Sequence, residues 1–271
     1  MARVWLVTGA SKGFGRTIAE AALALGDTVV AVVRRPESVK DLDVHAVALD
    51  MADPTRIAPA VEEVLAAHGH VDVLVNNAGR GIIGAAEEVS DKDLRELMEL
   101  HFFGPVALTR ALLPSMRKRG SGAIVQMSSE GGRFSSPGVS AYSATKFALE
   151  GWSESLSAEV RPFGIHVLIV EPGPFRTSFN EPDALSFAPD LGVYESTAGR
   201  MRDKVRSVHG RQAGDPVLAA QAIVTALASP EPPLRLPLGN EAVDRIRAHL
   251  DSARTEIDRW EDISRATDFP G

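Results

Sequence analysis

Short apolar runs alternate along the chain with longer segments in which apolar residues recur at helical spacing. The apolar runs cover residues 3–8, 28–33, 44–49, 71–75, 122–127, 164–170 and 234–238. The helical patterns cover residues 16–25, 54–68, 90–119, 140–161, 215–228 and 240–262. Buried strands joined by helices are typical of parallel sheets, because each crossover helix covers one face of the sheet. The pattern therefore predicts an α/β fold, with a doubly wound parallel sheet of about seven strands flanked by helices on both faces.

Residues 178–212 interrupt this alternation. Apolar side chains are scattered here, including Phe179, Phe187 and Tyr194. A long connection beside the carboxyl end of a strand is typical of a lid over a binding site, so we expect a substrate lid. A disordered linker is the alternative, which the aromatic residues disfavour. Because no shift in composition divides the chain, residues 1–271 are predicted to form one domain.

Composition and charge exclude several classes of function. The 271 residues are 44% hydrophobic and 24% charged, with a net charge of −7 and no cysteine. The negative charge argues against a nucleic-acid partner, and the lack of cysteine excludes disulfides and thiolate nucleophiles. His68 and His70 flank a helix-ending glycine with no third ligand nearby in sequence, so no metal is expected. No apolar run has the length of a membrane span, and we expect a cytoplasmic protein that acts on a small molecule.

A glycine-rich segment follows the first apolar run directly and precedes a helical pattern. Gly9, Gly13 and Gly15 fall within seven residues. Such a turn lets the backbone approach a pyrophosphate closely and directs helix N-terminal amides toward its negative charge. A tight turn without a ligand would use glycine equally well, but the strand before and the helix after favour a dinucleotide site.

The second apolar run ends in Arg34 and Arg35. In a dinucleotide-binding fold this position meets the adenosine ribose, where an acid binds a free 2′-hydroxyl and an arginine accommodates a 2′-phosphate. Lys12, in the glycine-rich turn, adds a third cation. Because guanidinium groups match phosphate oxygens, the sequence predicts NADP(H) in preference to NAD(H). Two solvated loop arginines are the alternative.

Tyr142 and Lys146 are four residues apart in a helical pattern, so both side chains are expected on one face of a helix. An isolated tyrosine has a pKa of about 10 and is a poor base at neutral pH, whereas a nearby ammonium favours the tyrosinate and lowers that pKa. The pair therefore suits acid/base chemistry. An ordinary surface tyrosine and lysine at this common spacing are the alternative.

Taken in order, these segments resemble the short-chain dehydrogenase/reductase family, which has a Rossmann-type fold. The resemblance covers about residues 4–177. Residues 8–15 are similar to the family's cofactor turn, residues 76–79 (Asn-Asn-Ala-Gly) to its sheet-stabilising segment, and residues 172–177 to its nicotinamide loop.

The resemblance implies a role for each matched residue. Tyr142 exchanges a proton with the carbonyl or alcohol oxygen, and Ser129, thirteen residues before it, hydrogen-bonds that oxygen. Lys146 holds the cofactor ribose and lowers the pKa of Tyr142. Ser128 is the alternative hydroxyl, since neighbouring strand residues face opposite sides. The residues implied to contact the cofactor are Gly9, Ser11, Lys12, Gly13, Phe14, Gly15, Arg34, Arg35, Asp50, Met51, Asn77, Ala78, Gly79, Tyr142, Lys146, Pro172, Gly173, Phe175 and Thr177.

One position departs from the family's pattern, because this chain has His101 where the family usually has Asn. That Asn tends to support a water that links Lys146 to solvent. We therefore place His101 with the catalytic residues and expect it to keep the backbone role. With a reference pKa of about 6.5, it could also relay protons and add a pH-dependent step. A buried, hydrogen-bonded structural histidine is the alternative.

The predicted function is the reversible reduction of a ketone or aldehyde with NADP(H). The alternatives are an NAD-dependent alcohol dehydrogenase and a catalytically silent, NADP-binding regulatory protein. An apolar substrate pocket is suggested by Ile82, Phe134, Val139 and Phe179, although each could be a core residue instead. The resemblance also implies a homodimer or homotetramer joined through two long helices, around residues 94–116 and 143–160.

Overall fold

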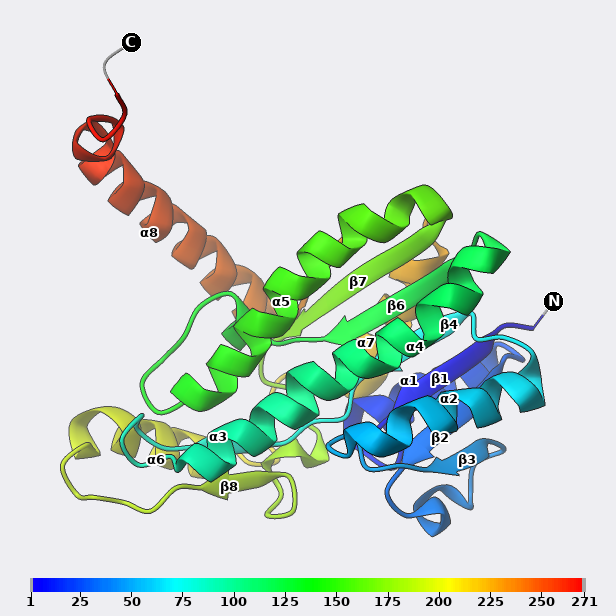
Figure 1. The fold of residues 1–271 in the computed structure, drawn as a ribbon. Helices are drawn as coiled ribbons and strands as arrows, with labels where there is room; N and C mark the ends of the chain where they lie inside the picture. Colours follow the sequence, from blue (N-terminus) through cyan, green and yellow to red (C-terminus); the bar gives the residue numbers. More distant parts are fainter. Residues whose placement is uncertain (1, 270–271) are drawn as a thin grey trace.

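The computed structural model, which describes residues 2–269, has the predicted seven-stranded parallel sheet between two layers of helices (Figure 1). The strand order is β3-β2-β1-β4-β6-β7-β9. The strands are β1 (Val4–Thr8), β2 (Thr28–Val33), β3 (His45–Ala48), β4 (Val73–Asn76), β6 (Gly122–Met127), β7 (Ile165–Pro172) and β9 (Arg235–Leu238). The helices are α1 (Gly13–Ala24), α2 (Pro54–His68), α3 (Asp91–Met98), α4 (Gly104–Arg119), α5 (Ser140–Val160), α6 (Arg200–Ser207), α7 (Pro216–Ala228) and α8 (Asn240–Arg265).

The sheet separates two apolar cores, because alternate residues of each strand point to opposite faces. On one face, Leu6 and Ile124 are buried with side chains from α2, α4 and α5. On the other face, Trp5 and Val125 are buried with side chains from α1 and α7. All strand pairs in this sheet are parallel, so the carboxyl ends of the strands meet on one side of the molecule.

The helix predicted at residues 90–119 is divided into α3 and α4 by a π-helical turn at Glu99–Phe103. This change in hydrogen bonding precedes Pro105 and Pro114, the two prolines of the segment. Pro105 follows the π-helical turn in helical backbone that is continuous from α3, so it cannot donate a hydrogen bond to a carbonyl of that turn, and Pro114 lies inside α4 without ending it.

The segment at residues 178–212 has more regular structure than its sequence pattern predicts. Within it, β8 (Leu185–Phe187) pairs in parallel with β5 (Gly81–Ile83), and α6 follows. An ion pair of 2.5 Å joins Arg202 of α6 to Glu88, whose side chains are 4% and 0% exposed. This buried pair fixes the segment against the loop that follows β5.

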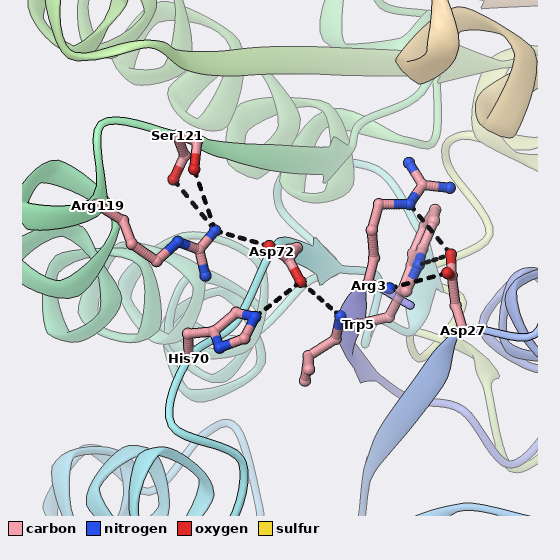
Figure 2. A network of polar contacts seen from close by, with 8 residues as sticks. Arg3, Trp5, Asp27, His70, Asp72, Arg119 and Ser121 are labelled. Carbon is pink, nitrogen blue, oxygen red and sulfur yellow. Dashed lines mark hydrogen bonds and ion pairs between the residues drawn. The ribbon is translucent and has the colours of Figure 1, made fainter. Parts of the chain in front are cut away.

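At the amino ends of the central strands, two carboxylates join neighbouring segments (Figure 2). Asp27 accepts hydrogen bonds from the backbone amide of Arg3 at 2.9 Å and from the indole of Trp5 at 2.8 Å. Asp72 accepts hydrogen bonds from Arg119 and from the backbone amide of Val4, both at 2.7 Å. These contacts connect β1 to the segments that lead into β2, β4 and β6.

The last helix, α8, extends away from the body of the molecule (Figure 1). Its buried residues, Ala242 and Ile246, lie in its first two turns, and most of its remaining length is exposed. No helix within residues 2–269 is both long enough and apolar enough to cross a membrane.

Candidate active site

A cavity of about 300 Å³ opens at the carboxyl ends of the strands, on the side opposite the carboxylates of Figure 2. It is lined by all four predicted catalytic residues and all four predicted substrate residues: Ser129, Tyr142, Lys146 and His101, and Ile82, Phe134, Val139 and Phe179. The predicted cofactor residues that also line it are Phe14, Asn77, Gly79, Pro172, Gly173, Phe175 and Thr177. Residues that are scattered along the sequence are thus brought to one surface.

Tyr142 and Lys146 lie on one face of α5, as their spacing predicts. The Lys146 ammonium lies 5.7 Å from the centre of the Tyr142 ring. It donates a hydrogen bond of 2.7 Å to the carbonyl of Met127, at the end of β6. The ammonium is therefore directed to the backbone and not to the phenol oxygen.

The predicted lowering of the Tyr142 pKa is wrong for the protein as the structure describes it. Burial raises the pKa of Tyr142 to about 12, and hydrogen bonding to Ser129 offsets only part of that increase. Burial also lowers the pKa of Lys146 to about 8, against a smaller effect of the Glu150 charge. Both groups are shifted toward their neutral forms, because the cavity wall removes them from water.

The two candidate serines at the end of β6 point to different environments. Ser129 accepts a hydrogen bond of 3.1 Å from the amide of Gly131 and lies beside Tyr142. Ser128 lies beside Glu150, packed so closely against Gly132 that a Cβ there would be 2.6 Å from the serine oxygen. The geometry therefore favours Ser129 as the hydroxyl that works with Tyr142.

His101 lies in the π-helical turn, 1% exposed, with both ring nitrogens hydrogen-bonded. Nε2 accepts from the amide of Arg80 at 3.1 Å, and Nδ1 lies 2.8 Å from the hydroxyl of Thr145. Because that hydroxyl donates to the carbonyl of Tyr142, Nδ1 must carry the proton and donate. Burial, with the nearby Lys146 charge, lowers the pKa of His101 well below its ordinary value. The geometry favours the structural alternative and argues against a pH-dependent relay near neutral pH.

The glycine-rich turn between β1 and α1 fits the diphosphate of a dinucleotide. Gly9 and Gly13 have positive φ angles of 66° and 58°, and a Cβ on Gly15 would lie 2.3 Å from the carbonyl oxygen of Gly9. Asn77 holds the turn in place by donating to the carbonyl of Thr8 at 2.8 Å. The first turn of α1 has no acidic residue and no side-chain cap, so its amides are available to an anion.

The predicted cofactor residues outside the cavity lie in four places. Gly9, Ser11, Lys12, Gly13 and Gly15 lie in or beside the glycine-rich turn, Ala78 follows β4, and Arg34, Arg35, Asp50 and Met51 follow β2 and β3. Arg34 and Arg35 are exposed, as an incoming phosphate requires, whereas the Met51 side chain belongs to the apolar core.

Lys12 is placed differently from the other two cations. It forms ion pairs with Asp183 and with Glu181, at 3.5 Å for the latter. Both acids belong to the segment at residues 178–212. A 2′-phosphate would therefore compete with these carboxylates for Lys12.

A polar cluster at one end of the cavity is absent from the sequence-based prediction. Arg245 of α8 forms an ion pair of 2.5 Å with Glu130, and its guanidinium lies 4.6 Å from the centre of the Phe134 ring. Burial raises the pKa of Glu130, and its second carboxylate oxygen has no partner within residues 2–269. Lys204 of α6 lies 3.6 Å from Glu241, which also lines the cavity. No local sequence signal identifies these residues, because they come from three separate elements.

Comparison with known proteins identifies relatives over nearly the whole chain. The profile of the family described as short chain dehydrogenase matches residues 3–185. Oxidoreductase BOA17 of Botryotinia fuckeliana is 35% identical, over 98% of this chain and 100% of its own. The 3-ketodihydrosphingosine reductase of Bacteroides thetaiotaomicron is 36% identical, over 88% of each chain.

Solved structures agree with the fold. The crystal structure of a short-chain dehydrogenase from Streptomyces avermitilis is 55% identical, with a TM-score of 0.94 over 99% of this chain and 100% of the other. A metagenomic short-chain oxidoreductase in complex with NADP is 34% identical, with a TM-score of 0.61 over 64% of this chain and 83% of the other.

Proposed function

The chain belongs to the short-chain dehydrogenase family and is an oxidoreductase, and from that premise we propose that it catalyses the reversible, NADP(H)-dependent reduction of a ketone or aldehyde. The observation that carries this proposal is the convergence of Tyr142, Ser129 and Lys146 on one cavity, beside a turn that fits a dinucleotide. The bound nicotinamide supplies the hydride. The protein must then supply the proton and the groups that stabilise charge on oxygen.

Tyr142 is the proton donor in the direction of reduction. With a pKa of about 12, its phenol is fully protonated at neutral pH and can donate to the carbonyl oxygen of a substrate. Ser129 lies beside the phenol and can donate a hydrogen bond to the same oxygen as negative charge develops there. In the oxidative direction, the phenolate form of Tyr142 would accept the alcohol proton while the oxidised nicotinamide would take the hydride, and Ser129 would hydrogen-bond the same oxygen.

Lys146 favours the tyrosinate that remains after the proton has left. Its ammonium lies 5.7 Å from the ring of Tyr142, and its pKa of about 8 leaves it mostly protonated at neutral pH. A positive charge at this distance, inside a cavity shielded from water, favours the anionic phenolate. Burial sets the resting pKa of Tyr142, and Lys146 acts on the charge that appears during turnover.

The preference for NADP(H) rests on Arg34 and Arg35. Both are exposed where β2 ends, and no acidic residue occupies that position. The metagenomic relative crystallised with NADP supports the same choice. Changing both arginines to alanine should weaken NADPH binding by about 10- to 100-fold and leave NADH binding unchanged, because charged hydrogen bonds to phosphate are worth about 1.5–3 kcal/mol. Equal losses for the two cofactors would contradict the assignment.

The substrate side of the cavity favours a largely apolar ketone or aldehyde. Ile82, Val139 and Phe179 contribute apolar walls, and Glu130 is a polar residue at the far end. Apolar walls select size and shape, whereas a single polar group fixes orientation.

The proposal is tested by following NADPH oxidation against a panel of aliphatic and aromatic aldehydes and ketones, with Tyr142→Phe as the control. We expect turnover by the wild type and a loss of about 10²- to 10⁴-fold in the variant, the usual contribution of a positioned acid. NADPH binding without turnover on any substrate would contradict the proposal. Turnover that survives in Tyr142→Phe would contradict the role of the phenol.

A further inference from the structure

The exposed part of α8 carries large apolar side chains. Leu250, Ile257 and Trp260 are 50%, 69% and 50% exposed, and Ile263 is 64% exposed. Figure 1 shows this part of the helix projecting away from the sheet and from the helices that cover it. An isolated helix is only marginally stable in water, and most helices are stabilised by packing their apolar face. The projecting turns of α8 therefore need a surface to pack against.

The spacing of these side chains indicates what kind of surface that is. Ile246, Leu250, Ala253, Ile257 and Trp260 follow one another at intervals of four, three, four and three residues. This is the spacing of a coiled-coil seam, a narrow stripe that packs against one other helix. Ile246 is buried against its own subunit, so the seam begins in the protein core and continues outward.

We propose that α8 pairs with α8 of a second copy of this chain in an antiparallel arrangement. A centred antiparallel pair places Leu250 opposite Trp260, and Ala253 opposite Ile257. A pair of two large side chains at each end of the seam is then followed by a pair of one small and one large side chain. Such alternation lets two helices pack closely. The helix macrodipoles also oppose each other favourably in this orientation.

The charges beside the seam favour the antiparallel orientation over the parallel one. Arg247 and Glu261 occupy equivalent flanking positions, two heptads apart. In an antiparallel pair, Arg247 of each copy lies opposite Glu261 of the other, which gives two attractive contacts. These offset the single Arg254–Arg254 and Glu256–Glu256 contacts at the centre of the pair. A parallel pair would instead bring Glu256 of one copy against Glu261 of the other, and two such repulsions disfavour it.

The first test is the oligomeric mass of the full chain, measured by light scattering after gel filtration over a range of concentrations. Leu250→Glu/Ile257→Glu should reduce the mass of the assembly twofold. Ala248→Glu/Thr255→Glu, which adds the same charge on the opposite and exposed face of α8, should leave the mass unchanged. A wild type that remains monomeric, or an assembly that the seam variant leaves intact, would overturn the proposal.

The second test measures orientation and uses the absence of cysteine from the chain. Ala253→Cys and Ile257→Cys are prepared as two separate single-cysteine proteins, mixed and oxidised. An antiparallel pair gives a disulfide-linked dimer that contains one copy of each protein, and little linkage in either protein alone. A parallel pair links each protein to itself, and that outcome would overturn the antiparallel assignment.

A membrane surface is the other occupant that an exposed apolar helix could have. It is tested by co-sedimentation with vesicles of phosphatidylcholine and phosphatidylglycerol. We expect no binding by the wild-type dimer. Vesicle binding that Leu250→Glu/Ile257→Glu abolishes would overturn pairing with a second copy. All three readouts are independent of turnover, so they stand whether or not the proposed reaction is correct.

Discussion

The two ends of the same parallel strands use polar groups in opposite ways. At the amino ends, both oxygens of Asp27 and of Asp72 have partners in the protein (Figure 2). At the carboxyl ends, buried oxygens of Ser143 and Glu130 have no partner within residues 2–269. A satisfied network contributes to stability, whereas unsatisfied buried groups cost stability and are expected where a protein keeps them for function. The polar groups at the amino ends of the strands therefore stabilise the fold, whereas those at the carboxyl ends are suited to catalysis.

The ionisable groups differ in the same way. At the carboxyl ends, burial shifts the pKa values of Tyr142 and Lys146 against their charged forms. At the amino ends, contacts with Arg3 and Trp5 outweigh burial and hold the pKa of Asp27 below its ordinary value. Groups displaced from their ordinary pKa by burial are typical of sites that exchange protons.

The largest effect is expected for Lys146→Met, which should raise stability and abolish most turnover. Lys146 is 6% exposed, and its folded-state pKa of about 8 lies below the ordinary 10.5. The unfolded chain therefore binds more protons between these values, and stability rises with pH across that window. The cost of burying the Lys146 ammonium is fully present below pH 8. Removing the ammonium should therefore add up to about 3 kcal/mol to the free energy of unfolding at pH 7.

This prediction is checked by urea unfolding of both proteins at pH 7 and at pH 10. The difference between variant and wild type should shrink at the higher pH. A variant that is less stable than the wild type at pH 7 would show that the Met127 hydrogen bond outweighs the cost of burying the ammonium.

An intermediate effect is expected for Asp72→Ala, at the other end of the strands. The substitution leaves the Val4 amide and Arg119 without their acceptor, which should lower the free energy of unfolding by about 1–3 kcal/mol. Turnover at a temperature where both proteins are folded should not change. Asp43→Ala, at an exposed aspartate, is the matched control and should stay within about 0.5 kcal/mol of the wild type. Equal losses of stability in Asp72→Ala and Asp43→Ala would contradict a stabilising role for the network at the amino ends.

The smallest effect is expected for His101→Asn, which tests a hydrogen-bonded group within the candidate active site itself. His101 lies at the carboxyl ends, yet both of its ring nitrogens are satisfied, as at the amino ends. We expect a loss of about 1 kcal/mol in stability from the altered hydrogen bonds, and no change in the pH profile of turnover. A shift of the profile near neutral pH would restore the proton-relay role.

Local patterns were enough to predict the strands, the glycine-rich turn and the face of α5 that carries Tyr142 and Lys146. They could not predict the Glu88–Arg202 and Glu130–Arg245 pairs, whose members are 114 and 115 residues apart and follow no periodicity. Local patterns also could not predict the direction of the Tyr142 pKa shift. Spacing places the ammonium near the phenol, but burial depends on the assembled cavity, and burial has the larger effect.

The central claim is that the carboxyl ends perform the reaction and the amino ends hold the fold. The most direct test measures NADPH-dependent turnover and the free energy of unfolding together for Tyr142→Phe and Asp72→Ala. We predict that Tyr142→Phe loses turnover and keeps its stability, while Asp72→Ala loses stability and keeps its turnover. Retained turnover in Tyr142→Phe, or equal losses of both properties in both variants, would contradict the account.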